Sequence, residues 1–233
     1  MESKNITKIL LVVAVVTAAF VVLLPLFGAA WINSIPGVYE YKISTEGLSQ
    51  YQGGLITDII VPMPMRDGSL VFSEEELQNQ QFGNWKSVIV VTPHGKMLAF
   101  QSTDGDLTDI DADFFKKFDP GELAVTDIRD ESLSPLIREN SDESKEWNSG
   151  TENRSEYVSI IFLPEDLVPL NANATDIVVN LELTISEGLN HSILGDTFRV
   201  TILERIPPEI RGEIPVNAHI TQHLDGNWVP LNG

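Results

Sequence analysis

The sequence predicts a mainly β protein, in which an N-terminal transmembrane helix is followed by an antiparallel β-sandwich-like ectodomain with two short helices. An uncharged apolar segment occupies residues 9–31. After it, short runs rich in β-branched and aromatic residues are separated by Gly, Pro, Asn and Asp turns, which is typical of antiparallel sheets. Cysteine is absent, so an exported domain must be held together by its hydrophobic core rather than by disulfides.

The apolar segment at residues 9–31 is long enough to cross a membrane once. At ~1.5 Å per residue it forms a helix about 34 Å long, against a hydrocarbon core of roughly 30 Å. Lys4 and Lys8 precede it, and no charged residue follows until Glu40. The positive-inside rule therefore predicts a single-pass cell-membrane protein with a cytoplasmic tail, 1–8, and everything after the signal anchor outside the cell.

A cleaved secretory signal is the alternative for the same segment. Small residues at 28–30 follow Pro25, as a processing site requires. Both interpretations export the same domain. We expect a linker at 32–37, one extracellular β domain at 38–233, and a mobile polar loop at 139–156 within it.

Alternating or continuous apolar runs predict the strands of this domain. The segment 176–187 alternates most clearly, because its odd-numbered positions from Ile177 to Ile185 are apolar and Asn180, Glu182, Thr184 and Ser186 face water. Two runs across a Pro-Gly turn at 93–95 predict a hairpin. The remaining predicted strands are 38–44, 55–62, 85–92, 96–102, 123–129, 157–164, 196–206, 214–224 and 228–231.

Two helices are expected. Ser73 and Glu76 have the spacing of a capping box, which predicts a short helix within 74–80. The segment 112–118, ADFFKKF, is interpreted as a helical turn capped by the aspartates before it.

Those aspartates are also the strongest candidate for a ligand site. Calcium prefers six to eight oxygen ligands, and closely spaced carboxylates in a loop can supply several of them. The spacing is not that of an EF-hand, so two interpretations remain: a calcium site, or a solvated turn that caps the following helix. The residues concerned are Asp104, Asp106, Asp109, Asp111 and Asp113.

Other motifs are weaker indications of a functional site. The sequons at Asn153, Asn173 and Asn190 all lie in the predicted extracellular part and are candidate glycosylation sites. His219 and His223 lie in a predicted strand, where residues four apart are roughly 13 Å from each other and cannot share an ion. No nucleophile elbow or cysteine nucleophile is present in the sequence, so we expect no enzyme and no cofactor other than the possible calcium.

The formal net charge of −19 restricts the partners. So acidic a surface repels phosphate backbones and favours cations and basic proteins, which excludes nucleic acid as an expected partner. We expect contact with membrane lipid through residues 9–31, and protein partners or self-assembly outside the membrane.

An apolar N-terminal helix that leads into an acidic, cysteine-free β domain, with segments such as GGLITDIIVPMPMRDG at 53–68, is similar to uncharacterised single-pass cell-surface and envelope proteins of archaea. The resemblance implies a membrane-anchored structural or interaction protein, in a surface assembly or a membrane complex, and it transfers no site residue. A calcium- or glycan-binding surface module is the alternative. A pilin-like filament subunit is a second one, although the processed leader of pilins is missing because Ile9 follows Lys8 directly.

Overall fold

The computed structural model describes Thr17 and residues 36–66, 68–119, 131–139, 155–186, 197–224 and 227–230. The predicted tail at 1–8, the apolar segment at 9–31 apart from Thr17, and most of the linker and of the loop at 139–156 lie outside these residues. So does the predicted strand at 123–129. Within the described ranges, no helix has the length and apolar character needed to cross a membrane.

The described residues are mainly in antiparallel strands, which confirms the mainly β, antiparallel part of the predicted fold class. In chain order the elements are β1 (Gly37–Glu46), η1 (Leu48–Gln50), β2 (Tyr51–Gln52), β3 (Thr57–Val61), β4 (Met63–Arg66), β5 (Ser69–Leu70), α2 (Glu74–Leu77), β6 (Gln81–Phe82), β7 (Trp85–Thr92), β8 (Gly95–Ser102), β9 (Asp111–Phe118), β10 (Glu131–Ser134), β11 (Arg138–Glu139), β12 (Ser155–Leu163), β13 (Val168–Pro169), β14 (Ile177–Ser186), β15 (Thr197–Ile206), β16 (Gly212–Leu224) and β17 (Asn227–Pro230).

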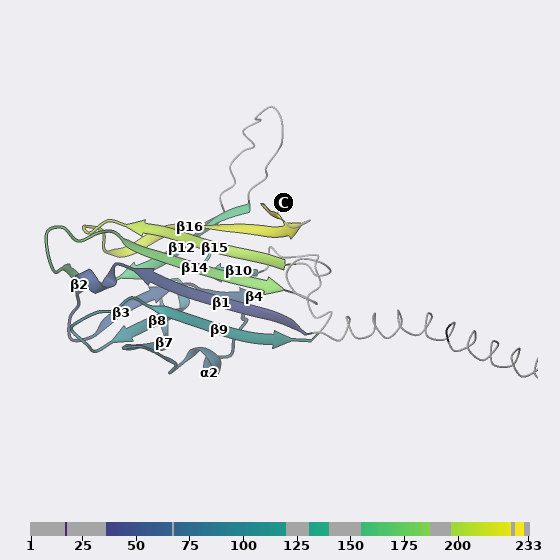
Figure 1. Ribbon diagram of the computed structural model, residues 1–233, viewed down its shortest axis with the longest axis horizontal. Coiled ribbons are helices and arrows are strands. Elements are labelled where there is room, and N and C mark those ends of the chain that lie inside the picture. Colours follow the sequence, from purple (N-terminus) through teal and green to yellow (C-terminus); the bar gives the residue numbers. More distant parts are fainter. Residues whose placement is uncertain are drawn as a thin grey trace, which may run out of the picture.

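One large sheet forms most of the domain, with the strand order β6-β7-β8-β3-β12-β16-β15-β14-β1-β9. The sheet curls into two layers, one from β9 to β15 and the other from β12 to β6 (Figure 1). Contacts bring its two ends together: the ring centroids of Phe82, on β6, and Phe114, on β9, are 5.3 Å apart. The sheet is therefore nearly closed around one core.

Strand β16 connects the two layers. Its first part, Gly212 to Ile220, pairs with β12, whereas its pairing with β15 covers only His219 to His223. The strand thus leaves one layer and enters the other along its length. A strand that changes layer in this way makes the corner of a β-sandwich.

The core is filled by the inward side chains of both layers. On β14 the odd-numbered residues from Ile177 to Ile185 are buried, as the alternation predicts. The predicted hairpin at 85–102 is confirmed as β7 and β8, and the capping box of Ser73 and Glu76 is confirmed at the start of α2. Burying the inward apolar side chains of both layers supplies the main favourable free energy of folding.

The prediction of a second helix, at 112–118, is wrong. Residues 111–118 form strand β9, which pairs with β1 from Gly37↔Phe118 to Ser44↔Asp111. Its side chains alternate with a period of two, since Ala112, Phe114 and Phe118 are buried and Phe115 is exposed. A strand at this position completes the layer that faces β7 and β8.

Two further predictions need correction. Thr184 and Ser186 were expected to face water but are buried, 6% and 9% exposed. Thr184 lies on β14 between Glu40 and Arg199, whose longer side chains flank it on the neighbouring strands. The predicted loop at 139–156 also included residues that form strands, because Glu139 belongs to β11 and Ser155 and Glu156 belong to β12.

Candidate functional site

The five candidate calcium ligands do not form one cluster. Asp104, Asp106 and Asp109 lie in the loop between β8 and β9, whereas Asp111 and Asp113 are in β9 itself, on its exposed face. Across the part of the chain that the structure describes, no group of three or more acidic, His or Cys side chains comes close enough to hold a metal ion.

The loop aspartates instead connect segments that are distant in sequence. Asp109 accepts a hydrogen bond at Oδ1 from the Leu48 N–H, 2.8 Å away, and so satisfies the first amide of η1. Asp106 forms an isolated β-bridge with Gln52, and its carbonyl oxygen accepts a bond from Asn84 Nδ2 at 3.1 Å. The predicted role as caps of a helix at 112–118 is wrong, because that segment is a strand; Asp109 caps a different turn, 61 residues away in sequence.

The predicted glycosylation sites are only partly within the described residues. Asn173 is exposed in the turn before β14, and its N–H donates to Asn171 Oδ1 at 2.9 Å. Thr175, the third residue of that sequon, accepts a hydrogen bond at Oγ1 from Gln50 Nε2 at 2.7 Å. Asn153 and Asn190 lie outside the described ranges.

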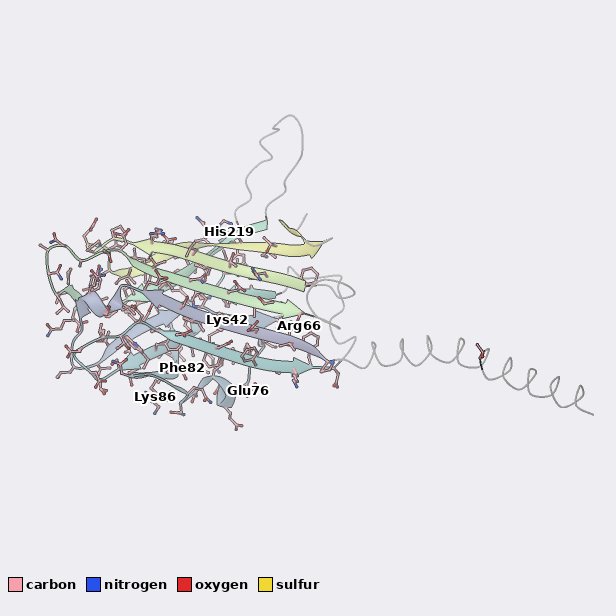
Figure 2. All side chains as sticks on the ribbon, in the orientation of Figure 1. Lys42, Arg66, Glu76, Phe82, Lys86 and His219 are labelled. Atoms are coloured by element: carbon pink, nitrogen blue, oxygen red, sulfur yellow. The ribbon has the colours of Figure 1, made fainter. Side chains whose placement is uncertain are left out.

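The histidines within the described ranges lie in strand β16 and in one turn. Both His219 and His223 belong to β16, as predicted, and His219 is exposed on its outer face (Figure 2). His94, in the turn between β7 and β8, lies beside Glu213, with 3.3 Å between Nε2 and Oε2.

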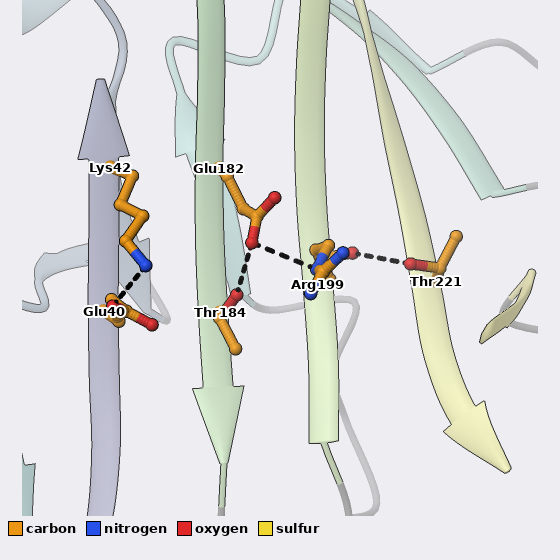
Figure 3. Close-up of polar contacts among 6 residues, drawn as sticks. All are labelled: Glu40, Lys42, Glu182, Thr184, Arg199 and Thr221. Carbon is orange, nitrogen blue, oxygen red and sulfur yellow. Dashed lines mark hydrogen bonds and ion pairs between the residues drawn. The ribbon is translucent and has the colours of Figure 1, made fainter. Parts of the chain in front are cut away.

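A row of polar side chains crosses the outer face of β1, β14, β15 and β16 (Figure 3). Glu40 and Lys42 form an ion pair at 2.6 Å, and Arg199 pairs through Nε with Glu182 at 3.2 Å. Thr184 donates to the same Glu182 oxygen at 3.2 Å. The row satisfies most of its own charge, so we interpret it as a stabilised surface rather than as a binding site.

Asp113 lies at the edge of this row. It is the cross-strand neighbour of Lys42. Partial burial and the Glu40 carboxylate raise its pKa, although Lys42 acts in the opposite direction. The sequence carries these charges at alternating positions, but only the register of the strands shows that they meet.

The end of the domain opposite Gly37 has a different surface. The strand register places the end of β1 beside the start of β14, since Glu46 pairs with Val178. The turn from β15 to β16 lies at the same end, because Ile177 pairs with Ile206. We call the four segments 47–56, 103–110, 164–176 and 207–211 the distal loops. They lie at the end that carries the β2 label in Figure 1, away from the start of β1.

Large apolar side chains are exposed on three of the distal loops. They are Leu55, Ile56, Val168, Leu170 and Ile210, and we call them the distal apolar patch. Sequence reasoning assigned no role to them. The sequence analysis placed Leu55 and Ile56 in the predicted strand 55–62, whereas β3 starts at Thr57. For the others the available signal was the neighbouring prolines, since Pro169 lies between Val168 and Leu170 and Pro207-Pro208 precedes Ile210.

Comparisons with known proteins give no match: no protein-family model, curated protein or solved structure resembles the chain significantly.

Proposed function

We propose that the chain is a membrane-anchored extracellular protein of the cell envelope, whose β domain makes structural or recognition contacts with other proteins. The observation that carries this proposal is the short separation between the apolar segment, which ends at residue 31, and β1, which starts at Gly37. An extended chain spans at most about 3.6 Å per residue, so such a linker holds that end of the domain close to the bilayer.

The arrangement of strands supports a recognition role. Because β1 runs from Gly37 to Glu46, the distal loops are carried to the opposite end of the domain, away from the proposed anchor. Loops presented at one end of a rigid β-sandwich are a common location of binding surfaces. The described charges and hydrogen bonds link strands and loops to one another, which suits a rigid support.

Membrane orientation is tested with single cysteines, because the natural chain contains none. Ser49→Cys places a thiol at an exposed position in η1, and Ser3→Cys places one before the apolar segment. We expect a membrane-impermeant maleimide to label the Ser49→Cys protein in intact cells, and the Ser3→Cys protein only after permeabilisation. Equal labelling of both in intact cells, or release of the chain into the medium, contradicts the anchored topology.

The interaction role is tested on the full chain extracted from native membranes in a mild non-ionic detergent. We expect it to migrate with at least one other protein in a stable complex. A single monomeric species at all detergent concentrations contradicts the role, whatever the membrane orientation.

A further inference from the structure

The side chains of the distal apolar patch are exposed to solvent. Leu55 is 94% exposed, Ile56 55%, Leu170 54%, Val168 52% and Ile210 42%. Scattered exposed apolar residues are normal on protein surfaces, but five of them on adjoining loops at one end indicate a contact site.

The three segments that carry the patch are in direct contact. The Leu170 N–H donates to the Gln50 carbonyl at 2.9 Å, and β13 pairs with β2. Arg211 Nε donates to the Leu167 carbonyl at 2.7 Å, which joins the third segment to the second. A methyl group on Gly54 would lie 2.2 Å from Asp166 Oδ2, so the loop before β3 also packs against the loop before β13.

Buried contacts hold the base of the patch together. Tyr51 is fully buried and donates from its hydroxyl to the Thr175 carbonyl at 2.6 Å. The Arg211 guanidinium carbon lies 5.2 Å from the centre of the Tyr51 ring, and Leu167 is buried beside it. A surface that is already ordered loses little conformational entropy when a partner covers it.

The surroundings of the patch are strongly acidic. Arg211 is the sole basic residue in the distal loops, and its guanidinium is turned inward onto Tyr51 and the carbonyls of Leu167 and Ile210. The acidic residues in the same loops are Asp104, Asp106, Asp109, Glu165, Asp166, Asp176 and Glu209. An incoming surface therefore meets apolar side chains within a negative potential.

We propose that the distal apolar patch docks a second protein, through a surface on which apolar side chains are flanked by lysine or arginine. Charge complementarity selects this partner: two copies of the chain would bring their acidic loops together, and anionic headgroups would be repelled for the same reason. The inference rests on the proposed function and specifies which surface of the domain does the recognition.

Photo-crosslinking in native membranes tests the docking surface. Single-cysteine variants of the full chain, Leu55→Cys and Val168→Cys, carry a benzophenone maleimide in the patch. Matched controls are Leu203→Cys and Val91→Cys, two apolar residues that are 64% and 81% exposed elsewhere on the domain. We expect adducts from the patch variants at yields at least about ten-fold above the controls, the ratio expected for a contact worth roughly 1.4 kcal/mol or more.

The chemistry of the adduct decides the identity of the partner. Mass spectrometry of the crosslinked peptide should give a sequence from another protein with apolar residues beside lysine or arginine. Replacing acids around the patch in the variant Glu165→Gln/Asp166→Asn/Glu209→Gln should lower the yield, while circular dichroism stays unchanged. A peptide of this same chain, a lipid adduct, or a yield insensitive to the acidic residues overturns the proposal.

The outcomes separate this inference from the proposed function. Adducts from the control positions alone, together with a stable detergent-extracted complex, overturn the docking surface and leave the interaction role intact. If no position gives an adduct and no complex is found, both the docking surface and the interaction role are overturned.

Discussion

The hydroxyl of Tyr41 donates a hydrogen bond to the carbonyl oxygen of Pro62 at 2.6 Å, between two buried positions. Tyr41 belongs to β1 in one layer, and Pro62 connects β3 and β4 on the other side of the core. The bond therefore joins the strand nearest the proposed anchor to the opposite layer. Proline provides no N–H, so its carbonyl is its only backbone hydrogen-bonding group.

We expect Tyr41→Phe to lower the free energy of unfolding by about 1–3 kcal/mol, because it leaves a buried carbonyl without its partner while keeping the ring. Urea unfolding of the full chain in a fixed non-ionic detergent measures the change. Phe115→Tyr is the control, since it adds a hydroxyl to a ring on β9 that is 60% exposed, and it should alter stability by less than about 0.5 kcal/mol. Equal effects of the two variants would contradict the assigned role of the bond.

Alkaline pH should destabilise the domain. Burial raises the pKa values of Tyr41 and Tyr157 well above the ordinary value of 10.0, and burial also raises the pKa of Tyr51. In the unfolded chain these tyrosines ionise near pH 10, so above that pH the unfolded state binds fewer protons than the folded state and stability falls. Their contribution is fully present below pH 10.

Urea midpoints measured between pH 8 and pH 11 check this expectation. The midpoint should be nearly constant up to about pH 9 and then decrease. The free energy of unfolding calculated from it should fall with a slope approaching about 1.4 kcal/mol per pH unit for each buried tyrosine. Tyr41→Phe should show a shallower decrease. The same slope in the variant would mean that Tyr41 does not titrate differently in the two states.

The contribution of Asp113 to stability should change with pH in the opposite direction to that of a carboxylate stabilised by an ion pair. Its folded pKa is raised above 3.8 by partial burial and by Glu40, so its ionised form is disfavoured in the folded state. Any stabilisation from this group is present below about pH 4 and is lost as the pH rises through the raised pKa. We therefore expect Asp113→Asn to increase the urea midpoint at pH 7, and to have little effect at pH 3.

Asp111→Asn is the matched control for this prediction. It removes the same charge from the same exposed face of β9, but its partner on β1 is the uncharged Ser44. It should raise the midpoint at pH 7 by less than Asp113→Asn does. An equal increase would indicate a general effect of net charge rather than the local environment of Asp113.

Gly37 should not tolerate a side chain. A Cβ at this position would lie 2.0 Å from Phe118 Cζ and 2.6 Å from Cε1, so the ring would have to move away from Tyr39, where the two centroids are 4.9 Å apart. We expect Gly37→Ala to destabilise the domain by about 1–3 kcal/mol. The double variant Gly37→Ala/Phe118→Leu should lose less than the sum of the single losses, and simple additivity in this cycle would show that the two positions are not coupled.

Local sequence patterns were sufficient for many strands but not for all. β14 was predictable because its apolar residues occupy every second position from Ile177 to Ile185. β9 was missed because the adjacent pairs Phe114-Phe115 and Lys116-Lys117 hide the alternation of apolar and polar residues. A short mixture of polar and apolar residues after aspartates is instead typical of a capped helix. In the folded chain Lys116 reaches the Val71 carbonyl with its ammonium group, so it can occupy an inward position.

The distal apolar patch could not be predicted in the same way. Leu55, Val168 and Ile210 are more than 40 residues apart in the chain, and the contacts that bring them together depend on the β2–β13 pairing and on Arg211. The aspartates at 104–113 illustrate the reverse case. Their spacing suggested one site, but Asp104, Asp106 and Asp109 lie in a loop, whereas Asp111 and Asp113 lie in strand β9.

The position of β1 also determines how the domain would respond to tension. A partner that pulls on the distal loop 164–176 of an anchored chain would apply force between Gly37, at one end of β1, and Ile177, at the opposite end of the neighbouring strand β14. The strand is paired on both sides, with β9 and with β14, and antiparallel hydrogen bonds lie perpendicular to the strand direction. The ladder between β1 and β14 would therefore be loaded in shear, with many bonds resisting together rather than opening in sequence.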